Sequence, residues 1–158
     1  MKTKLVLRYL FWALTLALMV FIFSMSGQNA TISSKASESF IRFFLDSINF
    51  LDESAKEALV SSLQFVVRKA AHFTVFATLG VFSYSAMLTY SIKNKTQIYT
   101  AGAICLIYAA SDEIHQIFVD GRAGRLYDVG IDFMGSIIGI LFVYLIIKCV
   151  KLWRKKNA

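Results

Sequence analysis

The stretch ASDEIHQIFVDGRAGRLYDVGID, residues 110–132, decides the fold because it places many charged side chains between two apolar segments. The preceding AGAICLIYA, residues 101–109, and the following FMGSIIGILFVYLII, residues 133–147, are hydrophobic enough to lie in lipid. The stretch itself carries titratable side chains, which include Asp112, Glu113, His115, Arg122, Arg125, Asp128 and Asp132. Ionisable groups beside a membrane segment are costly, so this concentration indicates either a structural ion-pair network or a functional site.

The composition indicates a membrane protein. Of the 158 residues, 57% are hydrophobic and only 17% are charged, whereas soluble domains are nearer ~25% charged. Apolar runs near the length of a bilayer crossing lie at residues 5–25, 66–90, 98–119 and 129–150. We therefore predict an all-α fold, a polytopic bundle of about four transmembrane helices that forms a single domain over residues 1–158. Cys105 and Cys149 fall inside apolar runs and are expected to be small buried hydrophobes without a disulfide.

The distribution of lysine and arginine predicts the orientation of the bundle. Three basic groups occur near the N-terminus, between the second and third runs, and at the C-terminus: Lys2, Lys4, Arg8, Lys93, Lys95, Lys148, Lys151, Arg154, Lys155 and Lys156. With four crossings these groups share one side of the membrane, and the positive-inside rule makes that side cytoplasmic. Both termini are then cytoplasmic, and the charged stretch lies at the outer face. The same distribution explains the net charge of +7 without nucleic-acid binding.

The region between the first two runs predicts a helix in the first outer loop. SESFIRFFLDSINFL, residues 37–51, repeats large apolar side chains at short helical intervals: Phe40, Phe43, Phe44, Ile48 and Leu51. Such spacing is typical of a helix in the membrane interface, either as a lid over the bundle or as a plain connector. The first run follows MKTK and ends in the small residues of SMSGQNA, so a cleaved signal peptide is an alternative to a retained helix.

Helical spacing groups the charged residues into faces that can converge. Residues three or four apart on a helix lie about 60° or 40° apart around the axis. Arg68 and His72 therefore share one face, and Asp112 and His115 share another. A third face aligns two acidic residues with two glycines, Asp128, Asp132, Gly135 and Gly139. The glycine pair allows another helix to approach closely, so the acidic pair is expected to point into the bundle.

The mixture of residue types suits an anionic, phosphate-bearing headgroup. Histidine moves protons near neutral pH, and arginine binds phosphate in bidentate fashion. The anion would be held by three arginines, Arg68, Arg122 and Arg125. His115, oriented by Asp112, would serve as acid or base, and His72 would be its partner or a nucleophile. The candidate catalytic residues are therefore His72, Asp112, Glu113, His115 and Asp132.

Other interpretations stay open for these residues. In a purely structural network, the arginines would neutralise the carboxylates of Asp112, Glu113, Asp128 and Asp132. No cofactor is predicted, but a divalent metal could be held by the two histidines with Asp112, Glu113 or Asp132. A transporter is disfavoured because charge appears at one end only, and the motifs of soluble hydrolases are absent. Lys69, about 100° around the helix from Arg68, is expected to reach the surface outside the site.

The motifs RKAAHF at residues 68–73, TLG at 78–80 and SDEIHQIFVDGRAGRLYDVGIDFMGSIIG at 111–139 resemble those of the VanZ-like family of bacterial membrane proteins. The resemblance covers a motif core of residues 67–139 and implies a small polytopic protein of the bacterial cytoplasmic membrane. The founding relative of that family is linked to low-level resistance to the glycopeptide teicoplanin. With the motif positions included, the candidate substrate-binding residues are Arg68, Gln116, Arg122, Arg125 and Asp128. Asp120 stands where the family often has proline, and Phe76 where it often has an aromatic hydroxyl.

These expectations combine into two functional hypotheses. The leading one is an envelope protein that binds a lipid-linked anionic headgroup at the outer leaflet, with a phosphatase-like hydrolase or transferase as its enzymatic version. RLYDVGIDFMGSIIG, residues 125–139, is faintly similar to the last motif of lipid phosphatases that use a histidine nucleophile, but Tyr127 stands where that histidine is expected. The alternative is a noncatalytic membrane binder that sequesters a lipophilic glycopeptide or shields its target. The expected partners are membrane lipids, a lipid-linked precursor or a lipoglycopeptide, and the pattern predicts no particular oligomeric state.

Overall fold

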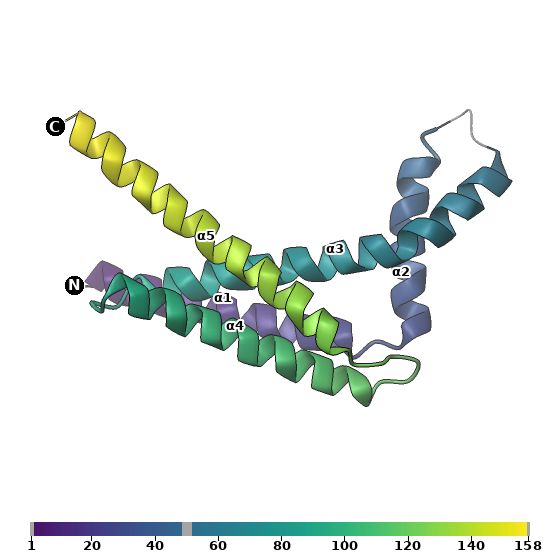
Figure 1. The fold of residues 1–158 in the computed structure, drawn as a ribbon, viewed down its shortest axis with the longest axis horizontal. Helices are drawn as coiled ribbons and strands as arrows, with labels where there is room; N and C mark the ends of the chain where they lie inside the picture. Colours follow the sequence, from purple (N-terminus) through teal and green to yellow (C-terminus); the bar gives the residue numbers. More distant parts are fainter. Residues whose placement is uncertain (1, 49–51, 158) are drawn as a thin grey trace.

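The computed structural model describes residues 2–48 and 52–157, and within these ranges it contains helices and no strands. The helices are α1 (Lys2–Ser26), α2 (Ala30–Leu45), α3 (Glu53–Met87), α4 (Asn94–Ile117) and α5 (Leu126–Lys156) (Figure 1). The prediction of an all-α fold is therefore confirmed.

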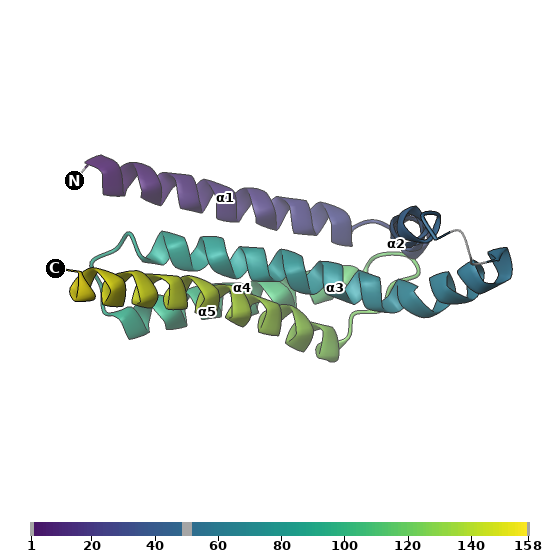
Figure 2. The same cartoon turned by 90° about the horizontal axis from the view of Figure 1, so that it is seen from above.

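Four helices, α1, α3, α4 and α5, run along the bundle in alternating directions, while α2 lies across one end (Figures 1 and 2). α3 is the central element, because it contacts each of the other four helices. The N-terminus, the α3–α4 turn and the C-terminus lie at one end of the bundle, whereas α2 and the α4–α5 loop lie at the other (Figure 1). The basic groups of the sequence therefore gather at the end opposite to the charged stretch 110–132.

Three helices, α1, α3 and α5, are long and apolar enough to cross a membrane by length and composition. The prediction of four crossings is thus not confirmed, because α4 does not meet the same standard. Its last two turns lower the hydropathy of the run at residues 98–119, since they carry Asp112, Glu113, His115 and Gln116. α3 has 35 residues and is about 52 Å long. It is therefore longer than the ~30 Å apolar core of a bilayer. Its N-terminal part packs against α2.

Glycines bring the backbones of α3 and α5 together. A Cβ on Gly135 would overlap the carbonyl group of Phe73, and a Cβ on Gly139 would overlap that of Ala77. The prediction that this glycine pair lets another helix approach closely is therefore confirmed. Asp132 lies just before the pair on the same face of α5, so the close crossing directs its carboxylate into the bundle, where it is 1% exposed.

α1 is tied to the other helices at both of its ends. Near the first end, Arg8 Nε donates a hydrogen bond to Thr89 Oγ1 at 3.2 Å. At the second end, Ser26 Oγ donates to Asp112 Oδ2 at 2.8 Å. Between them, a buried core cluster joins α1 to α3 and α4 through Ile22, Phe76, Leu79, Cys105 and Ala109. These contacts make α1 part of the bundle.

The two cysteines differ in their burial, and neither forms a disulfide. Cys105 is buried in the core, as expected from its apolar surroundings. Cys149 is exposed on α5, so the expectation of burial is wrong for this residue. An apolar run identifies a helix that can lie in lipid, but it does not separate the side that faces the bundle from the side that faces outward.

α2 confirms the helix predicted in the first loop for residues 37–45. The side chain of Asn29 caps its N-terminus by accepting a hydrogen bond from a backbone N–H at 3.0 Å. Ile41 and Leu45 are buried against Val60 of α3. The aromatic side chains of the predicted series are exposed, namely Phe40, Phe43 and Phe44. Leu51, the last member of that series, lies outside the described residues.

Candidate functional site

A polar cavity lies at the end of the bundle near α2, where α3, α4, α5 and the α4–α5 loop meet. Its volume is about 220 Å³, and it is lined by eight of the ten predicted site residues: Arg68, His72, Glu113, Gln116, Arg122, Arg125, Asp128 and Asp132. The structure therefore brings most of the candidate site together. Asp112 and His115 do not line this cavity.

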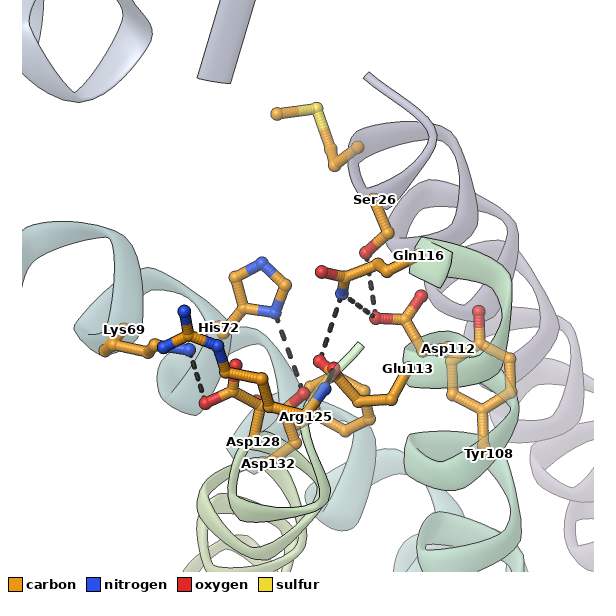
Figure 3. Close-up of polar contacts among 12 residues, drawn as sticks. Ser26, Lys69, His72, Tyr108, Asp112, Glu113, Gln116, Arg125, Asp128 and Asp132 are labelled. Carbon is orange, nitrogen blue, oxygen red and sulfur yellow. Dashed lines mark hydrogen bonds and ion pairs between the residues drawn. The ribbon is translucent and has the colours of Figure 1, made fainter. Parts of the chain in front are cut away.

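α3 and α5 contribute two pairs of opposite or potentially opposite charge (Figure 3). Lys69 forms an ion pair with Asp128, and His72 Nδ1 lies 3.7 Å from Asp132 Oδ2. The expectation that Lys69 extends to the surface outside the site is wrong. Because α3 and α5 cross so closely, Asp128 comes within reach of the flexible lysine side chain, which the angle around one helix does not predict.

α4 contributes a buried network of carboxylates. Gln116 Nε2 donates to Asp112 Oδ2 at 3.1 Å and to Glu113 Oε1 at 3.2 Å (Figure 3). Ser26 Oγ of α1 donates to the same Asp112 oxygen at 2.8 Å, and the backbone N–H of Arg125 donates to Glu113 Oε2 at 2.8 Å. Charge patterns in the sequence do not single out Ser26. The only sequence signal for Ser26 is that it ends FSMS, residues 23–26, a segment at the end of the first apolar run that agrees with the resemblance to the VanZ-like family.

The α4–α5 loop places Arg122 at the cavity. Gly121 has a φ of 72°, which favours glycine and turns the chain back toward the bundle. Arg122 Nη1 donates to Gln116 Oε1 at 3.4 Å and Nη2 donates to the Met25 carbonyl at 3.3 Å, while its buried Nε has no hydrogen-bond partner. Burial, followed by the nearby Arg68 guanidinium, lowers the pKa of Arg122. Its surroundings therefore do not fully compensate its positive charge.

Three arginines line the cavity without a carboxylate partner. Within residues 2–48 and 52–157, no ion pair joins an acidic side chain to Arg68, Arg122 or Arg125. This holds although three carboxylates line the same cavity. The arginine–carboxylate network that the sequence offered as an alternative is thus not formed. Guanidinium N–H groups remain available to an anionic ligand.

His115 lies apart from the polar cavity, against α1. Its ring stacks on Phe23, with the ring centroids 4.0 Å apart and the planes 20° apart. A Cβ added to Gly27 would lie 3.3 Å from His115 Cε1, so α1 closes over the ring. Asp112 Oδ2 accepts its hydrogen bonds from α1 and from Gln116. The predicted orientation of His115 by Asp112 is therefore not reproduced, and the two histidines do not meet at one cavity.

A larger apolar cavity of about 560 Å³ adjoins the polar one between α1, α2 and α3. Its apolar lining is contributed by side chains of all three helices, among them Phe21, Ile22, Phe40, Val75 and Phe76. Arg68, His72 and Arg122 line both cavities. The two cavities therefore share a wall of cationic and titratable side chains, which gives the site a polar half and an apolar half.

Comparison with known proteins identifies the family. A family model described as VanZ/LLP1 matches residues 11–148. The chain belongs to the VanZ/LLP1 family. The match extends well beyond the motif core at residues 67–139 and includes Ser26 and most of α1. No curated protein and no solved structure matches the chain.

Asp120 and Phe76, the two positions at which the resemblance led us to expect other residues, lie at the edges of the site in this VanZ/LLP1 protein. Asp120 precedes the Gly121 turn, and its carbonyl accepts a hydrogen bond from the Ala30 backbone at 3.4 Å, which ties the loop to the start of α2. Phe76 is 0% exposed and lines the apolar cavity. Without an aromatic hydroxyl at that position, this part of the cavity wall stays apolar.

One group of side chains in this VanZ/LLP1 protein lies close enough together to hold a metal ion after small side-chain movements. The possible ligand atoms of His72, Asp112 and Asp132 lie within 4.8 Å of one another. They come from α3, α4 and α5 respectively. His115 is not part of this group. Of the two histidines that the sequence offered as metal ligands, only His72 is therefore placed to bind one.

Proposed function

We propose that this VanZ/LLP1 protein binds a membrane amphiphile with an anionic headgroup, such as a lipid-linked envelope precursor, at the outer face of the bacterial cytoplasmic membrane. One observation carries the proposal. Arg68, Arg122 and Arg125 line a cavity without a carboxylate partner, and that cavity adjoins an apolar one. A ligand that is charged at one end and apolar at the other matches both halves.

The polar half suits a phosphate-bearing headgroup. Planar guanidinium groups bind phosphate oxygens in bidentate fashion and keep their charge at any physiological pH. The lowered pKa of Arg122 reflects burial and the repulsion of Arg68, and the opposite charge of a bound anion would offset both effects. Arg68 and Arg122 stand where the two cavities meet, so the phosphate would lie at the junction.

The apolar half suits a hydrocarbon chain. Its volume of about 560 Å³ falls within the range of ligand pockets, roughly 300–1,000 Å³. The cavity is bounded by α1 and α3, both of which are apolar enough to cross a membrane. A chain anchored in the bilayer could therefore reach the cavity while its headgroup stays at the polar end.

The outer face of the membrane is proposed from the charge distribution. The N-terminus, the α3–α4 turn and the C-terminus carry the basic groups and lie at the end of the bundle opposite to the site (Figure 1). The positive-inside rule assigns that end to the cytoplasm. The cavity then opens at the outer leaflet, where envelope precursors are used.

His72 is the side chain at the cavity best suited to proton transfer. Its Nδ1 lies 3.7 Å from Asp132 Oδ2, so a protonated Nδ1 directed at that carboxylate leaves Nε2 for the ligand. In the enzymatic version of the function, His72 would act as acid or base on a headgroup ester while the arginines stabilise its phosphate.

The test of binding is the lipid content of the purified protein. Wild-type protein and three variants, Arg68→Gln, Arg122→Gln and Arg154→Gln, would be purified from bacterial membranes in mild detergent, and the co-purified lipids identified by mass spectrometry. Arg154 is exposed at the opposite end and serves as the matched control. We expect the first two variants to retain roughly tenfold less of an anionic lipid, as loss of a charge-assisted hydrogen bond implies. Equal retention in all four proteins would contradict the proposal.

The test of turnover is a comparison of the two histidines. The lipids of membranes that contain wild-type protein, His72→Ala or His115→Ala would be compared at equal amounts of folded protein. A lipid that wild type and His115→Ala alter, but His72→Ala does not, would establish an enzyme that acts through the cavity. Identical lipids in all three membranes would leave a binding protein.

A noncatalytic binder of a lipophilic glycopeptide is the second candidate, favoured by the size of the apolar cavity relative to the polar one. In that case teicoplanin tolerance would fall when Ala71→Phe fills the apolar cavity, which Ala71 lines. Arg122→Gln would leave the tolerance unchanged. The reverse pattern would favour the anionic headgroup.

A further inference from the structure

We infer that His72, Asp112 and Asp132 bind a divalent transition-metal ion between α3, α4 and α5. Their possible ligand atoms lie within 4.8 Å of one another. The inference goes beyond the proposed function, because it depends on these three side chains and not on a lipid.

Burial leaves these two carboxylates in need of a cation. Asp112 is 2% exposed and Asp132 is 1% exposed, and Asp112 Oδ1 and Asp132 Oδ2 have no hydrogen-bond partner. In the part of the chain that the structure describes, no lysine or arginine pairs with either residue. Buried charges without a partner are strongly unfavourable. A divalent ion between the two carboxylates would neutralise both.

The other acidic residues of the site already have partners. Glu113 accepts hydrogen bonds at both oxygens, from Gln116 and from the Arg125 backbone. Asp128 pairs with Lys69. Three buried carboxylate oxygens of the site lack a hydrogen-bond partner, Asp112 Oδ1, Asp128 Oδ1 and Asp132 Oδ2, and of these only Asp128 Oδ1 is paired with a lysine. The two oxygens without a lysine or arginine belong to the aspartates that approach His72, which separates this group from a general accumulation of acidic residues.

The donor set indicates the class of metal. One imidazole nitrogen with two carboxylate oxygens suits Zn²⁺ and its neighbours in the first transition row. Ligands at ~2.0–2.1 Å in a tetrahedral site lie about 3.3 Å apart. His72 Nδ1 and Asp132 Oδ2 are 3.7 Å apart, so small side-chain movements would complete the site.

The surroundings also orient the ligands. Ser26 and Gln116 both donate to Asp112 Oδ2, at 2.8 and 3.1 Å, which fixes the carboxylate and leaves Oδ1 for the ion. Such supporting hydrogen bonds are usual around metal ligands. Because His72 and Asp132 also line the polar cavity, an open coordination position would face the proposed headgroup. With the metal bound, His72 is a ligand and no longer an acid or base.

The test is a titration of the purified chain with Zn²⁺ alone. Protein carrying an affinity tag without histidine would be stripped with a chelator and titrated in competition with a chromophoric chelator. We expect one Zn²⁺ per chain. His72→Ala and Asp132→Asn should each weaken binding at least about 100-fold, the upper end of the effect seen for supporting residues. Co²⁺ in place of Zn²⁺ should give absorption bands in wild type that these variants lack.

Two matched controls make the result specific. His115 is the other of the two histidines in the chain, and Asp128 is the acidic residue of the cavity that pairs with Lys69. His115→Ala and Asp128→Asn should keep the wild-type affinity. Absence of stoichiometric binding by folded wild type would overturn the inference, as would equal losses in His72→Ala and His115→Ala. If Asp112 and Asp132 share a proton and hold no metal, folded wild type will show no stoichiometric Zn²⁺ binding.

Folding and lipid binding are kept separate from the metal readout. Circular dichroism would check each variant. If Asp132→Asn does not fold, His72→Gln carries the test, because His72 is only partly buried. Zn²⁺ binding with unchanged lipid retention in Arg122→Gln would support the metal site and remove the proposed function. Absence of Zn²⁺ binding, together with reduced lipid retention in Arg122→Gln, would support the proposed function and remove the metal site.

Discussion

The hydroxyl of Ser26 links α1 to α4 through a single buried hydrogen bond. It donates to Asp112 Oδ2 at 2.8 Å across the interface between α1 and α4, and both residues are buried. Ser26→Ala should therefore lower the free energy of unfolding by about 1–3 kcal/mol, the range for loss of a hydrogen bond to a charged group, although Gln116 Nε2 still donates to the same Asp112 oxygen. Thermal unfolding in detergent, followed by circular dichroism, would measure the change.

Ser24 provides the control for that substitution. Its hydroxyl is exposed and donates to the Val20 carbonyl of its own helix at 2.9 Å. Ser24→Ala should change the unfolding free energy by less than about 0.5 kcal/mol, as is usual for surface sites. If the two alanine variants unfold alike, the contact between Ser26 and Asp112 does not stabilise the bundle.

Individual residues also mark how far the sequence predicts the site. Spacing along one helix correctly aligned Asp132 with the glycines of α5. The same spacing misplaced Lys69, whose partner Asp128 lies on α5. It also gave no role to Ser26, whose partner Asp112 lies on α4. The angle around a helix follows from residue numbers alone, whereas a contact between helices depends on how closely and at which level they cross.

At the scale of elements, the crossing of α3 and α5 determines the geometry of the site. A Cβ on Gly139 would overlap the Ala77 carbonyl, so Gly139→Ala must push the two helices apart. We expect a loss of about 1–3 kcal/mol in stability, as for other overpacked positions. The displacement should also separate Asp132 from His72 and weaken Zn²⁺ binding. Thermal unfolding and the chelator titration would measure both effects.

Gly130 is the matched control on the same helix. A Cβ at this position meets nothing within 4 Å, and alanine favours a helix over glycine by up to about 1 kcal/mol. Gly130→Ala should therefore keep or raise the stability and leave Zn²⁺ binding unchanged. A loss of stability equal to that of Gly139→Ala would mean that close packing is not the cause.

For α4, the length of the apolar run and its composition give different answers on whether the helix crosses the membrane. Its apolar run at residues 98–119 is long enough for a crossing, but its last turns bury Asp112, Glu113 and Gln116 within the bundle. A run of this kind predicts that a helix exists and not whether lipid or protein surrounds its polar end. For that reason the sequence predicted the helix correctly, while the crossing stays a proposal.

For the whole molecule, four crossings are still proposed because of how α4 is placed. It joins the end of α3 to the start of α5, which lie at opposite ends of the bundle (Figure 1). With 24 residues, it is about 36 Å long, enough to pass a bilayer core of ~30 Å. Its polar residues would be shielded by α3 and α5, which it contacts. Four crossings put both termini on the cytoplasmic side, and three would put them on opposite sides.

Cysteine labelling of intact cells would decide between these topologies. In a chain without native cysteines, single cysteines would replace Thr3 in the first turn of α1, Asn157 just after α5 and Ser61 in the first half of α3, all three of which are exposed. α1 begins and α5 ends at one end of the bundle, and α3 begins at the end that carries α2 (Figure 1). A maleimide that does not cross membranes should label Ser61→Cys at once, and the two terminal cysteines only after permeabilisation. Labelling of one terminus in intact cells would mean an odd number of crossings. Labelling of both termini, but not of Ser61→Cys, would invert the bundle. The cavity would then face the cytoplasm, where its arginines would meet soluble phosphates, and an outer-leaflet ligand would have to be abandoned.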